Sequence, residues 1–239
     1  MSKTLKVLSL LLTYPEAEMQ AAAGEMKAVL AAEKLVPANC LKGLSKLLDE
    51  LATGDIYDLQ ERYVLLFDRS RSLSLHLFEH IHGESRDRGQ AMVDLGEHYA
   101  LHGLDLSAKE LPDFLPLFLE FLSTRPIAEA RDLLGQPLHV IAALGERLRK
   151  RKSAYAWVFL ALESIARGKP ARAEVDELLA APEEDPEDLA ALDRAWEDQP
   201  VTFGPGSAGM APGISPGGGC PAARETLARI DRPADTKPH

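Results

Sequence analysis

The chain has 239 residues, of which 46% are hydrophobic, and its formal net charge is −10. This length suits one domain of good size, or one domain with a tail. The negative charge argues against general nucleic-acid binding, because neutralising phosphates requires a basic surface. An acidic surface instead favours partner segments that carry basic residues.

Neither the cysteines nor the apolar segments indicate export or membrane insertion. Cys40 and Cys220 are far apart and form no C-x-x-C motif, which fits a reducing compartment. The apolar run near the N-terminus ends at Tyr14-Pro15 and is too short for a signal peptide or a membrane span. We therefore expect a cytoplasmic protein with no stable membrane insertion.

Most periodic segments of the first half of the chain predict helices. A short amphipathic helix ends before Tyr14, and a second helix has Pro15 at its first position. A third helix ends at Gly54, and Asp55 is a plausible N-cap for a fourth that carries apolar residues as far as Phe67. No segment alternates with period two and is rich in β-branched residues, so no sheet is expected.

Two further segments predict helices buried in the middle of a bundle. The helix after Pro112 is apolar around most of its circumference, and residues 155–165 are similar. The basic run from Arg147 to Lys152 is interpreted as a solvated helix C-terminus rather than a nucleic-acid patch. The sequence therefore predicts an all-α fold, with a single helical bundle domain over residues 1–198.

The C-terminal segment has a different composition. Residues 199–239 are rich in Pro and Gly, with GPGSAGMAPGISPGGGCP near their centre. Such a segment buries too little apolar surface to offset the entropy lost on ordering. We expect a flexible, disordered tail.

The richest concentration of chemically useful side chains lies in residues 66–95, which hold four Arg, three Asp, two Glu and three His. Residues His76 to His80 match the H-x-x-E-H pattern of one class of zinc peptidases. In a helix the two imidazoles would share one face, and Glu79 would be the general base. The alternative is that His76 lies on a helix surface while His80 makes a local hydrogen bond. A zinc hydrolase would also need a third ligand, which the sequence does not identify.

Several segments resemble the NarJ family of nitrate reductase assembly chaperones, within the wider TorD/DmsD-like group of redox-enzyme maturation chaperones. The matching segments are YVLLFDR (residues 63–69), LFEHIHGESRDRGQAM (77–92), ELPD (110–113), LPLFLEFL (115–122), LLLTYP (10–15) and PVTF (200–203). The resemblance extends in order and spacing over roughly residues 5 to 205.

The resemblance implies an all-helical TorD-like fold and a chaperone that is not an enzyme. Its partner would be the apo form of the nitrate reductase catalytic subunit, including the N-terminal leader-like segment. It would assist insertion of the molybdenum cofactor into that client and bind no prosthetic group or metal itself. It would be absent from the finished enzyme, and we expect a monomer or a weak dimer. A helical interaction module for another client remains an alternative.

The candidate client-binding residues come from the two longest matching segments. They are Phe67, Asp68, Phe78, Glu79, His80, His82, Glu84, Arg86, Asp87, Arg88, Pro112 and Asp113. The charges within residues 66–95 nearly balance, with five acids against four Arg, so the charged candidates either tie a turn and helix ends together or face the client. Large apolar residues are usually buried, so we expect Phe67 and Phe78 in the core rather than on the floor of a groove.

Overall fold

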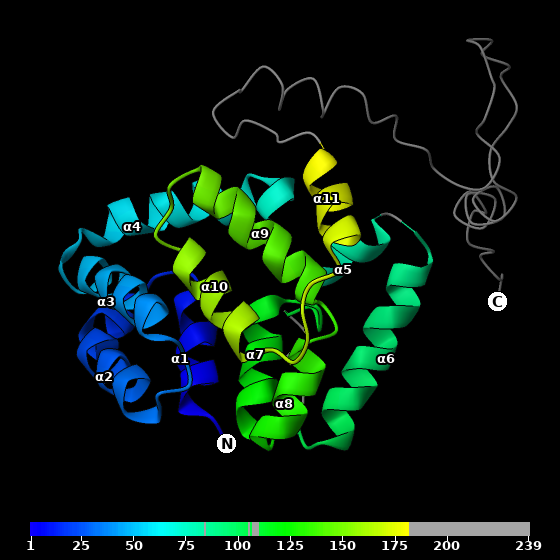
Figure 1. The fold of residues 1–239 in the computed structure, drawn as a ribbon, viewed down its shortest axis with the longest axis horizontal. Helices are drawn as coiled ribbons and strands as arrows, with labels where there is room; N and C mark the ends of the chain where they lie inside the picture. The colour runs from blue at the N-terminus through cyan, green and yellow to red at the C-terminus, as the bar shows by residue number, and fades with distance from the viewer. Residues whose placement is uncertain (84, 105, 107–109, 182–239) are drawn as a thin grey trace, which may run out of the picture. The chain divides into compact units, whose positions relative to one another are not determined.

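The computed structural model describes residues 1–83, 85–104, 106 and 110–181, and these residues form an all-helical unit (Figure 1). Its elements are α1 (Lys3–Leu11), α2 (Ala17–Glu33), α3 (Ala38–Thr53), α4 (Ile56–Tyr63), η1 (Val64–Asp68), η2 (Arg71–Leu73), α5 (Leu77–His82), α6 (Asp87–Leu101), α7 (Leu115–Thr124), α8 (Ile127–Leu134), α9 (Leu138–Lys150), α10 (Ala156–Ile165) and α11 (Arg172–Ala180). No strand occurs among the described residues, which confirms the all-α prediction. The predicted tail, residues 199–239, lies outside them.

Local sequence signals explain where several helices begin and end. The Asp55 carboxylate accepts hydrogen bonds from the backbone N–H groups of Tyr57 (2.9 Å) and Asp58 (3.4 Å), as expected for an N-cap. Gly54 follows the last residue of α3, as predicted. The second helix differs from its prediction, because Glu16 is extended and α2 begins at Ala17 rather than at Pro15.

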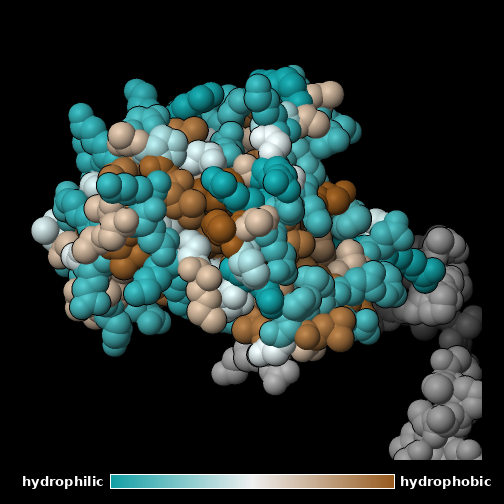
Figure 2. All heavy atoms as spheres, turned by 60° about the horizontal axis from the view of Figure 1, so that its bottom comes forward, coloured by the Kyte–Doolittle hydropathy of each residue, from teal (hydrophilic) through white to brown (hydrophobic). Residues whose placement is uncertain are grey.

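The core is centred on α1, which packs against α2 and α7. Leu5, Leu8 and Leu12 have no exposed surface, and eight of the ten residues of α7 are buried. α10 packs against α9 and α3 through one buried face, while Leu160 on its other face is exposed, so the prediction of a helix in the middle of the bundle is confirmed for α7 but only for one face of α10. On the face of the molecule drawn in Figure 2 most residues are hydrophilic, although apolar residues gather in its middle.

Gly43 fixes how closely α3 and α10 approach each other. A Cβ at this position would lie 2.0 Å from the Trp157 ring, closer than any real contact. We expect Gly43→Ala to lower the free energy of unfolding by about 2 kcal/mol, because the indole has to leave its site. Urea denaturation measures the change.

Gly24→Ala provides the matched control for this substitution. Gly24 lies in α2, and a Cβ there would meet nothing within 4 Å. Without a clash, replacing a helical glycine should raise stability by about 0.5 to 1 kcal/mol. Equal effects of the two substitutions would show that the Gly43–Trp157 contact does not limit the packing.

Candidate functional site

The charged segment that the sequence singled out is not one continuous helix. After α4 the backbone widens into the π-helix η1, where the Arg69 N–H donates to the Val64 carbonyl at 3.0 Å. The widening brings Phe67 into the core, with its ring 5.1 Å from both Tyr63 and Tyr155. The 3₁₀ turn η2 and the short helix α5 follow. Such π turns are often found at functional sites.

Two segments far apart in the sequence meet at the start of α5. The Leu77 N–H donates to the Asp113 carbonyl at 3.0 Å, and the Leu115 N–H donates to the Leu75 carbonyl at 2.8 Å. His76 and Phe114 therefore face each other as an isolated antiparallel bridge. This bridge joins the charged segment to the start of α7, so these two parts of the resemblance form one structural unit.

The Asp113 carboxylate, which is fully buried, is the centre of this unit. It accepts hydrogen bonds from the Phe78 N–H at 3.1 Å and pairs with His76 Nδ1, also at 3.1 Å. Arg88 Nη2 lies 4.0 Å from its other side and 3.1 Å from the Glu79 carboxylate. The charges of these side chains therefore hold α5, α6 and the start of α7 together.

The zinc-peptidase geometry does not form at the H-x-x-E-H pattern. His76 precedes α5 instead of lying within a helix, and its ring pairs with Asp113. His80 lies one turn further on, and its Nε2 bonds the Ser74 carbonyl at 2.9 Å. Burial lowers the pKa of His80, so its ring is neutral at neutral pH. The prediction of a local hydrogen bond for His80 is confirmed, whereas the position of His76 on a helix surface is wrong. Among the described residues no three His, Cys, Asp or Glu side chains could hold a metal ion together.

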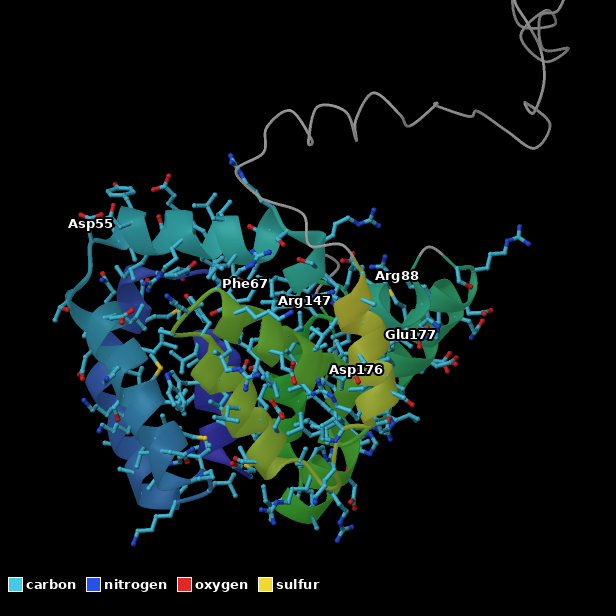
Figure 3. All side chains as sticks on the ribbon, turned by 45° about the horizontal axis from the view of Figure 1, so that its top comes forward. Asp55, Phe67, Arg88, Arg147, Asp176 and Glu177 are labelled. Atoms are coloured by element: carbon cyan, nitrogen blue, oxygen red, sulfur yellow. The ribbon has the colours of Figure 1, made fainter. Side chains whose placement is uncertain are left out.

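Arg147 corrects the interpretation of the basic run as a solvated helix end. Its side chain is buried near the end of α9 and points toward α11 and the 70–75 turn (Figure 3). It donates to the Ser72 carbonyl at 2.7 Å and to the Leu178 carbonyl at 2.5 Å. Arg149 and Lys150, by contrast, are exposed. The sequence of a basic run does not show which of its residues is buried, because that depends on how the helix packs in the tertiary fold.

An open groove of about 770 Å³ lies beside this unit, between the first two helices, η1 and the residues before α7. Its apolar surface includes Met19, Tyr14 and Phe114. Four carboxylates line it as well, from Glu16, Glu18, Asp68 and Glu110. An apolar groove lined by carboxylates is suited to a segment that carries both apolar and basic side chains.

The candidate residues therefore have different environments. Those held in the core or in the hydrogen-bonded unit are Phe67, Phe78, Glu79, His80, Arg88 and Asp113. Asp68 lines the groove, and the Pro112 carbonyl accepts a hydrogen bond from the buried Tyr99 hydroxyl at 2.9 Å. Arg86 and Asp87 are exposed at the start of α6, and the His82 ring packs on Phe78. Glu84 lies outside the described residues.

Most residues of the groove were not among the candidates. Tyr14, Glu16 and Glu18 lie at the end of one matching segment, LLLTYP, and just beyond it. That match could have directed attention to them, but nothing local shows that the start of α2 faces residues 110–114. Pairing distant segments requires the fold.

Comparison with known proteins gives a consistent result. A profile of the family described as "Nitrate reductase delta subunit" matches residues 16–161. The nitrate reductase molybdenum cofactor assembly chaperone NarJ of Escherichia coli K12 is 44% identical over 199 residues, covering 83% of this chain and 84% of that one. The probable chaperone NarW of the same strain is 37% identical, covering 83% of each.

More distant matches were also found. The probable NarJ of Bacillus subtilis 168 is 32% identical, over 64% of this chain and 82% of that one. A putative redox enzyme maturation protein from Archaeoglobus fulgidus, of known crystal structure, is 24% identical with a TM-score of 0.49, covering 68% of this chain and 91% of that one. The relatives named above from E. coli and B. subtilis are described as molybdenum cofactor assembly chaperones of nitrate reductase, two of them as probable ones. From the family profile and the E. coli relatives, the chain belongs to the nitrate reductase delta subunit family, to which the sequence resemblance had pointed.

Proposed function

We propose that this protein is a dedicated chaperone of a respiratory nitrate reductase, acting on the apo form of the catalytic subunit. It binds that subunit, including its N-terminal leader-like segment, and keeps it competent for molybdenum cofactor insertion and membrane assembly. The observation that carries this proposal is the acid-lined apolar groove in a chain 44% identical to an E. coli chaperone of this kind. The chaperone is not part of the finished enzyme.

The groove supplies a physical basis for recognising the client segment. Its apolar surface at Met19 and Phe114 would cover the apolar side chains of the bound segment. Carboxylates such as Glu18 and Glu110 would attract its Arg or Lys side chains and disfavour acidic segments. The groove thus selects a basic amphipathic segment.

The unit around Asp113 has a supporting role in this proposal. Phe114, which lies in the groove, is adjacent to Asp113 and bridges to His76. Fixing the bridge therefore fixes one side of the groove before the client arrives. A preformed groove loses less conformational entropy on binding than a flexible one.

The protein itself binds no prosthetic group in this proposal, and the cofactor goes to the client. It works in the cytoplasm, before the enzyme is attached to the membrane. Among the described helices, none has the length and apolar character needed to span a bilayer.

Calorimetric titration with a synthetic peptide of the client's N-terminal segment tests this proposal. We expect saturable binding. Glu18→Lys should weaken it about tenfold, because it replaces a negative side chain of the groove with a positive one, which repels the basic peptide. Glu25→Lys is the matched control, since Glu25 is exposed on α2 and does not line the groove. That control should bind almost as tightly as the unmodified chain.

The outcomes separate the alternatives. Absence of a complex at high peptide concentration would remove the leader-binding function. Equal weakening by both substitutions would place the peptide elsewhere. If the peptide fails to bind but another protein is captured specifically, the chain is a helical interaction module for a different client.

A further inference from the structure

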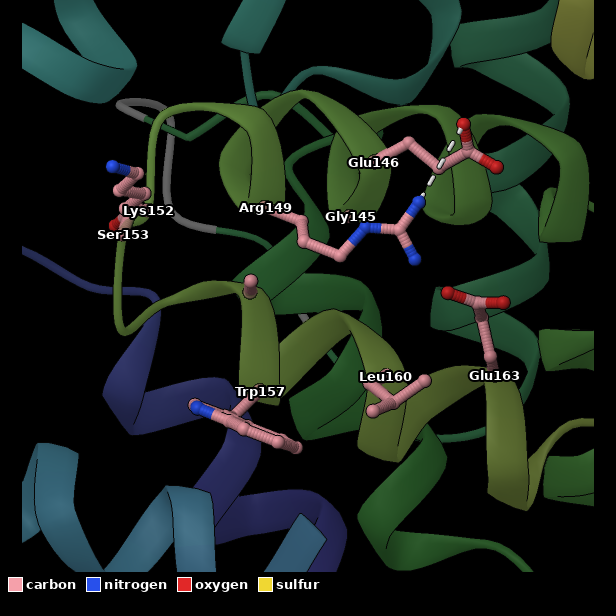
Figure 4. A pocket seen from close by; sticks show the side chains of 9 residues that line it. Gly145, Glu146, Arg149, Lys152, Ser153, Trp157, Leu160 and Glu163 are labelled. Atoms are coloured by element: carbon pink, nitrogen blue, oxygen red, sulfur yellow. Dashed lines mark ion pairs between the residues drawn. The ribbon is translucent and has the colours of Figure 1, made fainter.

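A second concave surface lies on another part of the molecule, between α9 and α10 (Figure 4). This pocket has a volume of about 300 Å³. It shares no lining residue with the acid-lined groove between α1, α2 and η1 that is proposed above to bind the client, here called the client groove. Small residues, Gly145 and Ala156, leave the space open. A Cβ at Gly145 would lie 3.1 Å from Phe159 Cβ and 3.3 Å from Glu163 Oε1, so the glycine lets the two helices approach closely.

One end of the pocket is apolar and held in place. Trp157 lies against Gly43 of α3, where no side chain could be accommodated beneath the indole. Leu160, one turn further along α10, is 38% exposed. Covering large apolar side chains on the wall of a pocket with another apolar group is favourable, because it removes apolar surface from water. This end is therefore suited to an aliphatic chain.

The other end of the pocket presents the carboxylate of Glu163, which has no partner within the part of the chain that the structure describes. Among the described residues, none donates a hydrogen bond to Glu163 or forms an ion pair with it within 4.0 Å. The neighbouring Glu146 is paired with Arg172 at 2.6 Å and with Arg149 at 4.0 Å. Burial raises the pKa of Glu163, and the charge of Glu146 raises it further, while Arg149 opposes both. A bound cation would relieve this penalty.

We propose that this pocket binds an arginine side chain of a partner protein, with its aliphatic stem over Trp157 and Leu160 and its guanidinium on Glu163. The pocket is apolar at one end and carries an unpaired carboxylate at the other, and an arginine side chain has the complementary arrangement. Guanidinium is more weakly hydrated than ammonium and bonds a carboxylate through two parallel N–H groups. The site is independent of the client groove and does not require the proposed function.

Two basic side chains of the pocket restrict the sequence of the segment that could bind. Arg149 and Lys152 also line the pocket, and they would repel a segment with several consecutive basic residues. The pocket therefore fits one arginine flanked by neutral or acidic residues. Arg149 is 74% exposed at its side chain, so it can move aside when the pocket is occupied.

Fluorescence of Trp157 tests the proposal directly. The chain has two tryptophans, and Trp196→Phe leaves Trp157 as the only one, which excitation beyond the tyrosine absorption band selects. We expect N-acetyl-arginine amide to change this emission saturably, at constant ionic strength. N-acetyl-citrulline amide, which has the same shape without the charge, should bind at least about tenfold more weakly, because the charge-assisted hydrogen bonds are lost.

Variants of the carboxylate complete the experiment. Glu163→Gln keeps the size of the side chain and should weaken binding of the arginine probe at least about tenfold, since its charge is gone. Glu25→Gln makes the same change on the surface of α2 and should leave binding unchanged. Thermal unfolding of both variants checks that they fold. The proposal is overturned if the arginine probe leaves the emission unchanged, if citrulline binds equally well, or if folded Glu163→Gln binds like the parent.

Discussion

Replacing Asp113 with Ala is expected to lower the free energy of unfolding by about 3 kcal/mol. The substitution removes a fully buried carboxylate, leaves the Phe78 N–H and the His76 ring without their acceptor, and takes away one of the two carboxylates beside Arg88. Uncompensated buried donors cost about 1–3 kcal/mol each, whereas Arg88 keeps its ion pair with Glu79 and adds less to the loss. Urea denaturation followed by circular dichroism measures the change.

Two further variants make the Asp113 experiment specific. Asp113→Asn retains one oxygen that can accept from the Phe78 N–H, so it should lower the free energy of unfolding by about half as much as Asp113→Ala. Asp87→Ala also removes an acid, but from the exposed first turn of α6, and should change stability by less than about 1 kcal/mol. If Asp113→Ala were no more destabilising than Asp87→Ala, Asp113 would not hold this unit together.

Asp113 also affects the client groove through Phe114. Loss of the carboxylate should loosen the bridge between His76 and Phe114, which contributes to one side of the groove. We therefore expect Asp113→Asn, which is still folded, to bind the client peptide more weakly mainly through a faster dissociation rate. Such an effect would distinguish a positioning residue from one that contacts the peptide.

Sequence patterns predicted helix ends and buried helix faces correctly where neighbouring residues determine them. Asp55 caps α4, Gly54 ends α3, and the apolar stripe after Pro112 is the buried helix α7. These signals depend only on neighbouring residues and on amphipathic spacing, so the sequence contains them.

The same reasoning failed where distant contacts decide the backbone. The spacing of Tyr63 and Phe67 is equally compatible with a continuing α-helix, yet the chain forms the π-helix η1 there. His76 and His80 match a helical metal motif, but the bridge to Phe114 keeps His76 outside α5. Phe114 lies tens of residues from His76, and periodicity carries no information about such a partner.

The candidate site shows the same division. The matching segments identified Asp113, Arg88 and Asp68 as important, but they could not separate the side chains that hold the fold from those that line the groove. Asp113 is fully buried, whereas Asp68 is exposed in the groove. Only burial and hydrogen-bond partners make this distinction, and they depend on the complete fold.

Arg147 gives the second large expected effect, because it joins three parts of the chain. From α9 its guanidinium reaches the Ser72 carbonyl beside η2 and the Leu178 carbonyl in α11. The 70–75 turn also supplies the Ser74 carbonyl that bonds His80 of α5. One buried side chain thus helps to fix both α11 and the turn that leads to the bridge at His76.

Arg147→Met is expected to lower the free energy of unfolding by about 3 kcal/mol, because it keeps most of the apolar stem but leaves two carbonyls without a donor. Arg149→Met is the matched control, with the same change two residues away at a side chain that is 74% exposed, and it should cost less than about 1 kcal/mol. Hydrogen exchange should accelerate in α11 and the 70–75 turn of Arg147→Met, while the amides of α1 remain protected. Uniform acceleration would mean that Arg147 stabilises the bundle as a whole, and an effect equal to that of Arg149→Met would mean that its burial contributes nothing. Selective acceleration would instead establish that α11 and the unit around Asp113 are held through a single side chain.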